Sequence, residues 1–317
     1  MSGRRIGLAL GSGSARGWAH IGVIKALAAH GIHPHVVCGS SIGALVGAAY
    51  VAGELDALEA WVRKITWPKI ARLADVKFAN GGLIEGDRLM RTLRALHEDA
   101  PIESLDIPFA AVAADLATGH EVWLREGSLI DAVRASMALP GIFSPVVMDD
   151  WRLADGGLVN PVPVAPCRAL GAEVIIAVNL NGDLVGRRVH RRSRSGSRRS
   201  LRAAVLDRLS KEVPNGLRSA AGLIAPQLLG AGTKSLGYFD VIFGAINVMQ
   251  DRITRNRMAG DPPDVILSPG LRQIGLLEFN RAEEAIEEGH AAVDQMLPVL
   301  KDVLGPIRRK TRNRRHG

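Results

Sequence analysis

Short apolar runs alternate with longer segments of helical spacing along the first two thirds of the chain. The runs that predict strands are Ile6–Leu10, Val36–Cys38, Phe109–Asp115, Glu121–Leu124, Arg152–Ala154 and Glu173–Asn179. The segments that predict helices are Gly17–His30, Ile42–Val51, Leu55–Lys64, Asp87–His97 and Leu129–Met137. This alternation predicts an α/β fold, with a parallel or mixed sheet covered by helices.

The alternation breaks after Asn181. Arg, Ser and Gly dominate as far as Ser200, which is typical of a linker, and Leu217–Gly232 then fits an amphipathic helix or a lid. The pattern resumes with a helix over Phe239–Met249, a strand at Val265–Leu267 and a helix over Asn280–Leu304 that Pro298 interrupts. We therefore expect a core (1–180), a basic linker with an apolar insertion (181–238), a C-terminal part packing on the core (239–305) and a basic tail (306–317).

The net charge of +8 is unevenly placed. Residues 187–202 hold eight arginines and residues 308–315 hold six basic residues, neither with an acid, which leaves 26 basic and 32 acidic residues elsewhere. Such blocks are usually solvated, and they can also bind anionic lipid head groups or nucleic acid phosphates. We favour peripheral contact of Arg187–Arg202 with an anionic membrane over nucleic acid binding.

Composition narrows the class of protein. The 317 residues are 47% apolar, enough for one large α/β domain with or without an appendage. The two cysteines, Cys38 and Cys167, have no metal-ligand spacing, so we expect a reducing compartment and no metal. The apolar run after Arg4 and Arg5 is too short for a signal peptide, and no run reaches the length of a membrane span. The sequence therefore predicts a cytoplasmic protein, peripheral at most on the inner face of the membrane.

A serine flanked by glycines follows the second predicted strand. Gly39-Ser40-Ser41-Ile42-Gly43 matches G-x-S-x-G, with a strand before it and a helix after it. In that setting the pattern forms a sharp turn that exposes a nucleophilic hydroxyl, and the helix N-terminus favours developing negative charge. The glycine spacing selects Ser41 rather than Ser40 as the nucleophile. The alternative is a serine that only caps the helix.

A glycine-rich turn follows the first predicted strand. Gly11-Ser12-Gly13-Ser14-Ala15-Arg16-Gly17 opens a helix, so its backbone N–H groups form an anion site. The glycine spacing misses the dinucleotide fingerprint by one residue, and the acidic residue expected about 20 positions later is absent. The turn also lacks the Gly-Lys-Ser/Thr of a Walker loop. The other interpretation is an oxyanion hole, with the N–H groups of Gly13 and Ser14 as donors and Arg16 supporting the loop.

A serine nucleophile needs a base, and Asp155 is the preferred candidate. It ends a short predicted strand and precedes Gly156-Gly157, and a carboxylate bonded to a serine can act as general base. Asp-Gly is equally a turn dipeptide, so a structural turn remains the alternative. A histidine triad would have to use His290, which lies in an acidic amphipathic helix rather than on a short loop after a strand. We interpret Asp115 as a turn carboxylate.

Taken together, these motifs resemble the patatin-like phospholipase family. The resemblance rests on the glycine-rich turn, the serine motif and Asp155-Gly156-Gly157, in that order, and it runs from about Ile6 to Asn181. The blocks Gly17–Val23, Ser136–Gly141 and Asn160–Pro163 are similar as well. The small bacterial branch related to neuropathy-target-esterase-like lysophospholipases is the most similar. One departure is that Ser12 and Ser14 replace the outer two of three consecutive glycines, and serine is strained wherever φ is positive.

The resemblance implies a three-layer α/β/α patatin-like fold with a mostly parallel central sheet, here with a helical C-terminal extension. It also implies a lipid acyl hydrolase with a Ser41–Asp155 dyad, the first turn as oxyanion hole, no cofactor and a phospholipid or lysophospholipid substrate. A homo-oligomer is left open. The alternatives are a Ser-His-Asp esterase, or a non-catalytic scaffold whose basic segments bind membrane or nucleic acid.

Overall fold

The computed structural model describes residues 4–66, 68–69, 76–79, 82–84, 91, 94, 99–182 and 238–305. The basic block at 187–202, the apolar segment at 217–232 and the tail from 306 lie outside the described residues, as does most of the helix predicted at 87–97. The statements below concern the described part of the chain.

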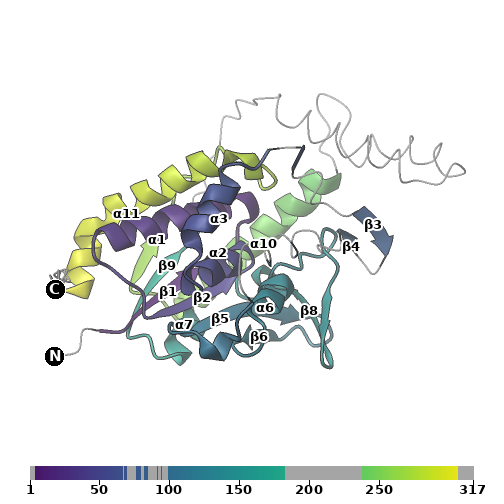
Figure 1. Ribbon diagram of the computed structural model, residues 1–317, viewed down its shortest axis with the longest axis horizontal. Coiled ribbons are helices and arrows are strands. Elements are labelled where there is room, and N and C mark those ends of the chain that lie inside the picture. Colours follow the sequence, from purple (N-terminus) through teal and green to yellow (C-terminus); the bar gives the residue numbers. More distant parts are fainter. Residues whose placement is uncertain are drawn as a thin grey trace, which may run out of the picture.

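The centre of the fold is an eight-stranded, mostly parallel sheet (Figure 1). Five parallel strands follow one another in the order β10 (Val265–Leu267), β9 (Val174–Val178), β1 (Ile6–Leu10), β2 (Val36–Ser40) and β5 (Phe109–Asp115). Three antiparallel strands complete the sheet. Strands β6 (Glu121–Leu124) and β8 (Trp151–Asp155) pair with β5, and β7 (Val146–Met148) pairs with β8. A separate hairpin joins β3 (Val76–Ala79) to β4 (Gly82–Ile84).

Helices cover both faces of this sheet, which makes three layers. One face carries α1 (Ala19–Ala29), α2 (Ile42–Val51), α3 (Leu55–Val62), α6 (Leu129–Ser136) and α11 (Ala282–Leu304). The other carries α7 (Val164–Ala169), and α10 (Tyr238–Gly260) packs Met258 against it. The strands alternate accordingly, because Leu8 and Leu10 of β1 face the first group and Ala9 faces the second. The three-layer α/β/α fold with C-terminal helices is therefore confirmed.

Short 3₁₀ turns connect several of these elements: η1 (Ser14–Trp18), η2 (Ile102–Ser104), η3 (Gly156–Leu158) and η5 (Phe279–Arg281). The predicted helix at 17–30 thus divides into η1 and α1. No described helix is both long enough and apolar enough to cross a membrane.

Two helix predictions need correction. The helix predicted to break at Pro298 continues through it, from 282 to 304. Proline removes one backbone hydrogen bond, but Val293 and Leu300, on either side of it, are both fully buried in the core and hold the helix on course. The helix predicted at 239–249 continues to Gly260 as α10. The prediction stopped at 249 because the second half of the helix buries polar side chains and so lacks an apolar period.

The ends of β2 and β8 meet along one edge of β5. Strand β6 pairs with residues 111–114 of β5 and so occupies one edge. Strand β2 ends with Ser40 opposite Val112, and β8, running the other way, ends with Asp155 opposite Ala113. Because a strand has only two edges, β2 and β8 share the remaining one and arrive head to head. The residue that follows β2 is therefore placed beside the last residue of β8.

Candidate active site

Ser41 occupies a sharp turn between β2 and α2. Its φ of 57° lies in the left-handed region, which is unusual for a residue with a side chain. The turn brings backbones together, since a Cβ at Gly39 would lie 2.4 Å from Ala44 backbone and one at Gly43 would lie 2.1 Å from the Leu10 carbonyl oxygen. Ser41 stands at the N-cap of α2, but its hydroxyl makes no capping hydrogen bond. The hydroxyl is directed elsewhere.

The Ser41 hydroxyl faces Asp155. Its Oγ donates to Asp155 Oδ2 at 2.5 Å, and the Gly157 backbone N–H donates to Oδ1 of the same carboxylate at 2.7 Å. Asp155 is only 2% exposed. Burial raises the pKa of the Asp155 carboxyl to about 6, against the opposing effect of these two hydrogen bonds. A serine hydroxyl bonded to a carboxylate of raised basicity can lose its proton to that carboxylate.

The backbone of Ser41 is held by a residue of α6. Ser136 Oγ accepts a hydrogen bond from the Ser41 N–H at 2.9 Å and donates to the Val112 carbonyl at 2.5 Å. The side chain of Ser136 is fully buried. It thus ties the sharp turn to the central strand β5. Sequence reasoning gave Ser136 no role, and its only signal was its place in a block similar to the family.

Within the part of the chain that the structure describes, the glycine-rich turn presents two backbone donors without an acceptor. The N–H groups of Ser12 and Ala15 donate to the carbonyls of Pro161 and Leu276. Those of Gly13 and Ser14 have no acceptor among the described residues. Ser14 has a φ of 52°. The serine that replaces a family glycine at this position therefore does adopt a positive φ, which is strained for a residue with a side chain. Two unsatisfied N–H groups in one turn are suited to an anion or a developing oxyanion.

Arg16 supports this turn from inside the protein. It is 6% exposed, and its Nε donates to the Ile274 carbonyl at 2.9 Å. Its Nη1 donates to Asn181 Oδ1 at 3.4 Å. Arg16 therefore joins the glycine-rich turn to the segments that contain Ile274 and Asn181.

The remaining motif glycines mark places where another residue lies against the glycine backbone. A Cβ would lie within 2.6 Å of another residue at each of Gly11, Gly17, Gly156 and Gly157. At Gly17 the neighbour is Ile42, the first residue of α2, so the glycine-rich turn packs directly on the helix of the serine turn. Asp115 accepts hydrogen bonds from Ala117 and Thr118 in the loop after β5, as a turn carboxylate does.

Among the described residues, no histidine contacts Ser41 or Asp155. His290 lies on α11 in the outer layer. His20 is fully buried, and its Nε2 bonds the Gly11 carbonyl at 2.7 Å. Burial lowers the pKa of His20 to about 4, which keeps the ring neutral beneath the glycine-rich turn. His30 pairs with Asp294 on the surface.

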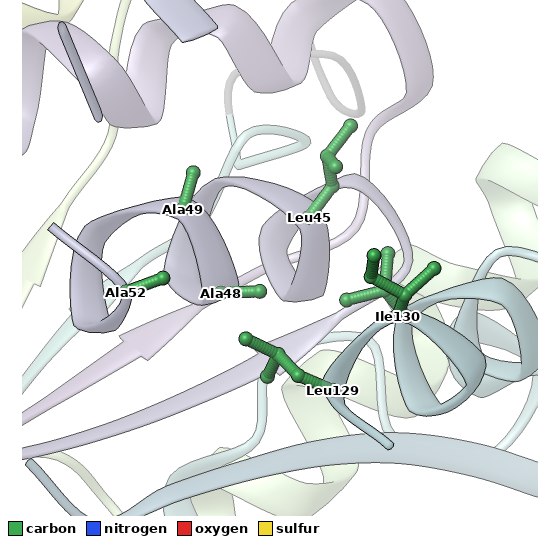
Figure 2. Close-up of a pocket in the computed structure, with 7 residues that line it drawn as sticks. Leu45, Ala48, Ala49, Ala52, Leu129 and Ile130 are labelled. Carbon is green, nitrogen blue, oxygen red and sulfur yellow. The ribbon is translucent and has the colours of Figure 1, made fainter. Parts of the chain in front are cut away.

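An apolar pocket lies between α2 and α6 (Figure 2). Leu45, one helical turn beyond Ser41, lies at one end of the pocket, and Ala52, the C-cap of α2, lies at the other. Across the gap stand side chains of the first half of α6, among them Leu129 and Ile130 (Figure 2). The lining is aliphatic throughout, and the cavity volume of about 20 Å³ has room for a single water molecule rather than for an acyl chain.

Comparison with known proteins identifies the family of this chain. The family model described as Patatin-like phospholipase matches residues 8–168, half of the chain. The chain belongs to the patatin-like phospholipase family. Within it, the chain falls in the NTE branch: an uncharacterized NTE family protein of Mycobacterium tuberculosis is 35% identical over 95% of this chain and 93% of its own length.

Two further comparisons cover a smaller share of the other protein. Patatin-like phospholipase domain-containing protein 6 of Homo sapiens is 34% identical over 57% of this chain, which matches 14% of the human protein. The solved structure of VipD from Legionella pneumophila aligns with a TM-score of 0.44 and 14% identity, over 95% of this chain and 67% of VipD. The family assignment rests on the family model and the mycobacterial relative.

Proposed function

We propose that this protein is a serine lipid acyl hydrolase of the phospholipase A or lysophospholipase type. Ser41 is the nucleophile, Asp155 is the general base, and the reaction passes through an acyl-enzyme. The observation that carries the proposal is the 2.5 Å hydrogen bond from Ser41 Oγ to Asp155 Oδ2 in a buried setting. Membership of a phospholipase family supplies the substrate class.

The reaction proceeds in two halves. Asp155 takes the proton of Ser41 as Oγ attacks the ester carbonyl carbon, and the oxyanion is stabilised by the N–H groups of Gly13 and Ser14. The ester bond breaks, the leaving alcohol takes the proton from Asp155, and the acyl group stays on Ser41. Water then attacks this ester with Asp155 again as base, which releases the fatty acid and restores the serine. The dipole of α2 favours the negative charge in both halves.

Hydrolysis assays test the proposal directly. Lysophospholipids and p-nitrophenyl esters of graded chain length would be given to the wild type and to folded Ser41→Ala, Asp155→Asn and His290→Ala variants. We expect both dyad variants to lose activity by several orders of magnitude and His290→Ala to retain it. Trapped acyl groups on Ser41, detected by mass spectrometry, would support the acyl-enzyme.

Two results would favour the alternative functions, a histidine-triad esterase or a non-catalytic binding protein. Loss of turnover in His290→Ala would point to a histidine triad. An inert wild type that binds nucleic acid in a strongly salt-dependent way would point to a binding protein. Contact of Arg187–Arg202 with anionic membrane lies outside the described residues, and vesicle binding by a variant without these arginines tests it separately.

A further inference from the structure

Helix α10 turns a polar face toward the interior of the protein. Gln250, Asp251 and Thr254 on this helix are 7%, 3% and 5% exposed, whereas the adjacent Val248 and Met249 are about half exposed. Burying polar groups while leaving apolar ones in water opposes the usual preference. Such an arrangement needs a reason, and the contacts of Gln250 supply one.

On one side, Gln250 is bonded toward the glycine-rich turn. Its Oε1 accepts a hydrogen bond from Asn181 Nδ2 at 3.2 Å, and Asn181 Oδ1 accepts one from Arg16 Nη1 at 3.4 Å. Arg16 lies in the turn that offers the free N–H groups of Gly13 and Ser14. Asn181 is 3% exposed, so the whole chain of side chains is buried.

On its other side, Gln250 lies against the loop that follows Asp155. A Cβ at Gly157 would lie 2.4 Å from Gln250 Nε2 and 2.7 Å from Ser12 Oγ. The amide of Gln250 therefore packs directly on Gly157, whose N–H holds Asp155 Oδ1 at 2.7 Å. A single glutamine thus touches the support of the carboxylate and, through Asn181, the support of the glycine-rich turn.

We propose that Gln250 is a positioning residue that fixes the oxyanion turn and the Asp155 loop relative to each other, with Asn181 as its relay to Arg16. The inference rests on the proposed function of this site. Both residues lie beyond the 8–168 segment that the family model matches, so this part of the machinery comes from the C-terminal region of the chain.

Glutamine suits this place because it is uncharged and both donates and accepts hydrogen bonds. Glutamate would still accept from Asn181 but would add a negative charge near Asp155, which raises the pKa of a carboxyl. Leucine has a similar size and removes the hydrogen bonds. These two substitutions therefore separate the charge of the residue from its bonding.

The test compares Gln250→Leu, Gln250→Glu and Met249→Ala, the last being the exposed neighbour on the same helix. With a water-soluble ester, we expect Gln250→Leu to lower kcat about 10- to 100-fold with little change in KM, as for small misplacements of catalytic groups. Gln250→Glu should move the acid limb of the pH–rate profile to higher pH. Met249→Ala should match the wild type in both.

A double-mutant cycle tests the relay. If Asn181 and Gln250 act through one chain, Asn181→Ala combined with Gln250→Leu should lose little more kcat than the worse single variant. Additive losses would overturn the relay. A folded Gln250→Leu with the kcat and pH profile of Met249→Ala would overturn the positioning role.

Hydrogen exchange keeps this inference separate from the proposed function. In Gln250→Leu, amides of both 11–17 and 154–158 should exchange faster than in Met249→Ala, whether or not the protein hydrolyses any ester tested. Unchanged exchange in both loops would overturn the inference. An inert wild type with faster exchange in both loops would leave the coupling standing and count against the hydrolase proposal alone.

Discussion

Ser136 Oγ accepts the backbone N–H of Ser41 at 2.9 Å. The bond joins the end of α6 to the turn before α2. Ser136 Oγ also donates to the Val112 carbonyl, which links the same turn to β5. Ser41 has a positive φ, which costs on the order of 1 kcal/mol or more. A strained turn of this kind persists because its surroundings hold it, and Ser136 is one of the residues that do so.

Ser136→Ala should therefore loosen the site and destabilise the fold. It leaves the Ser41 N–H and the Val112 carbonyl without partners in a buried region, at about 1–3 kcal/mol for each group. We expect a lower midpoint in urea unfolding and a lower kcat. Ser104→Ala is the matched control, because Ser104 also donates to a carbonyl but is exposed. Equal effects in the two variants would contradict the prediction.

The rate of ester hydrolysis should follow the ionisation of Asp155. Burial raises the pKa of this carboxyl to about 6, and a general base works only as the carboxylate. We expect kcat/KM for a soluble ester to rise with pH up to about 6 and to level off above it. A pH–rate profile between 4.5 and 8.5 checks this. An acid limb near pH 4, the ordinary carboxyl pKa, would contradict this prediction. A limb near pH 7 would also contradict it, because it would point to a group other than Asp155.

The same carboxyl should make stability depend on pH. Its pKa is about 6 in the folded protein against 3.8 ordinarily, so between these values the folded state binds more protons than the unfolded state. The free energy of unfolding should then fall as pH rises from about 4 to 6, relative to Asp155→Asn. At about 1.4 kcal/mol per pH unit the total is about 3 kcal/mol. Urea unfolding of both proteins at pH 4.5 and 7.5 measures about 2 kcal/mol of this total, because part of it accrues below pH 4.5. A constant difference would refute the shift.

Ser14→Gly should keep the activity and strengthen the fold. The proposed donor is the backbone N–H, which glycine retains, and glycine adopts a φ of 52° without strain. We expect kcat within about twofold of the wild type and a gain of about 1 kcal/mol in the free energy of unfolding. A tenfold or greater loss of kcat would show that the Ser14 hydroxyl takes part.

Helices α1 and α11 lie side by side (Figure 1). Two reciprocal glycines form their closest backbone contacts. A Cβ at Gly22 would lie 1.9 Å from the Ile286 carbonyl oxygen, and one at Gly289 would lie 2.0 Å from that of Ala19. Gly289→Ala should therefore force the helices apart, at about 1–3 kcal/mol or more. Gly244→Ala is the control, since a Cβ there meets nothing and should stabilise α10 by about 0.5–1 kcal/mol. Thermal unfolding of both variants tests the contrast.

Local patterns were sufficient for most elements of the first 180 residues. The strands at 6–10, 109–115 and 121–124 and the helix at 42–51 have the predicted bounds. The strands at 6–10 and 109–115 and the helix at 42–51 carry a strong apolar signal because almost all of their residues are buried. Beyond residue 181 the signal weakened, since α10 buries polar side chains and α11 continues through a proline.

The sequence by itself determined which residues are chemically able to act. G-x-S-x-G and Asp-Gly-Gly single out Ser41 and Asp155 through local backbone requirements, which are written in neighbouring glycines. Only the tertiary structure decided that these two residues meet, because that depends on β2 and β8 ending head to head on β5, 114 positions apart in the chain. The same holds for Ser136, Asn181 and Gln250. Asn181 and Gln250 have no motif of their own, and Ser136 has only its place in a block similar to the family. All three make long-range contacts that no local pattern encodes.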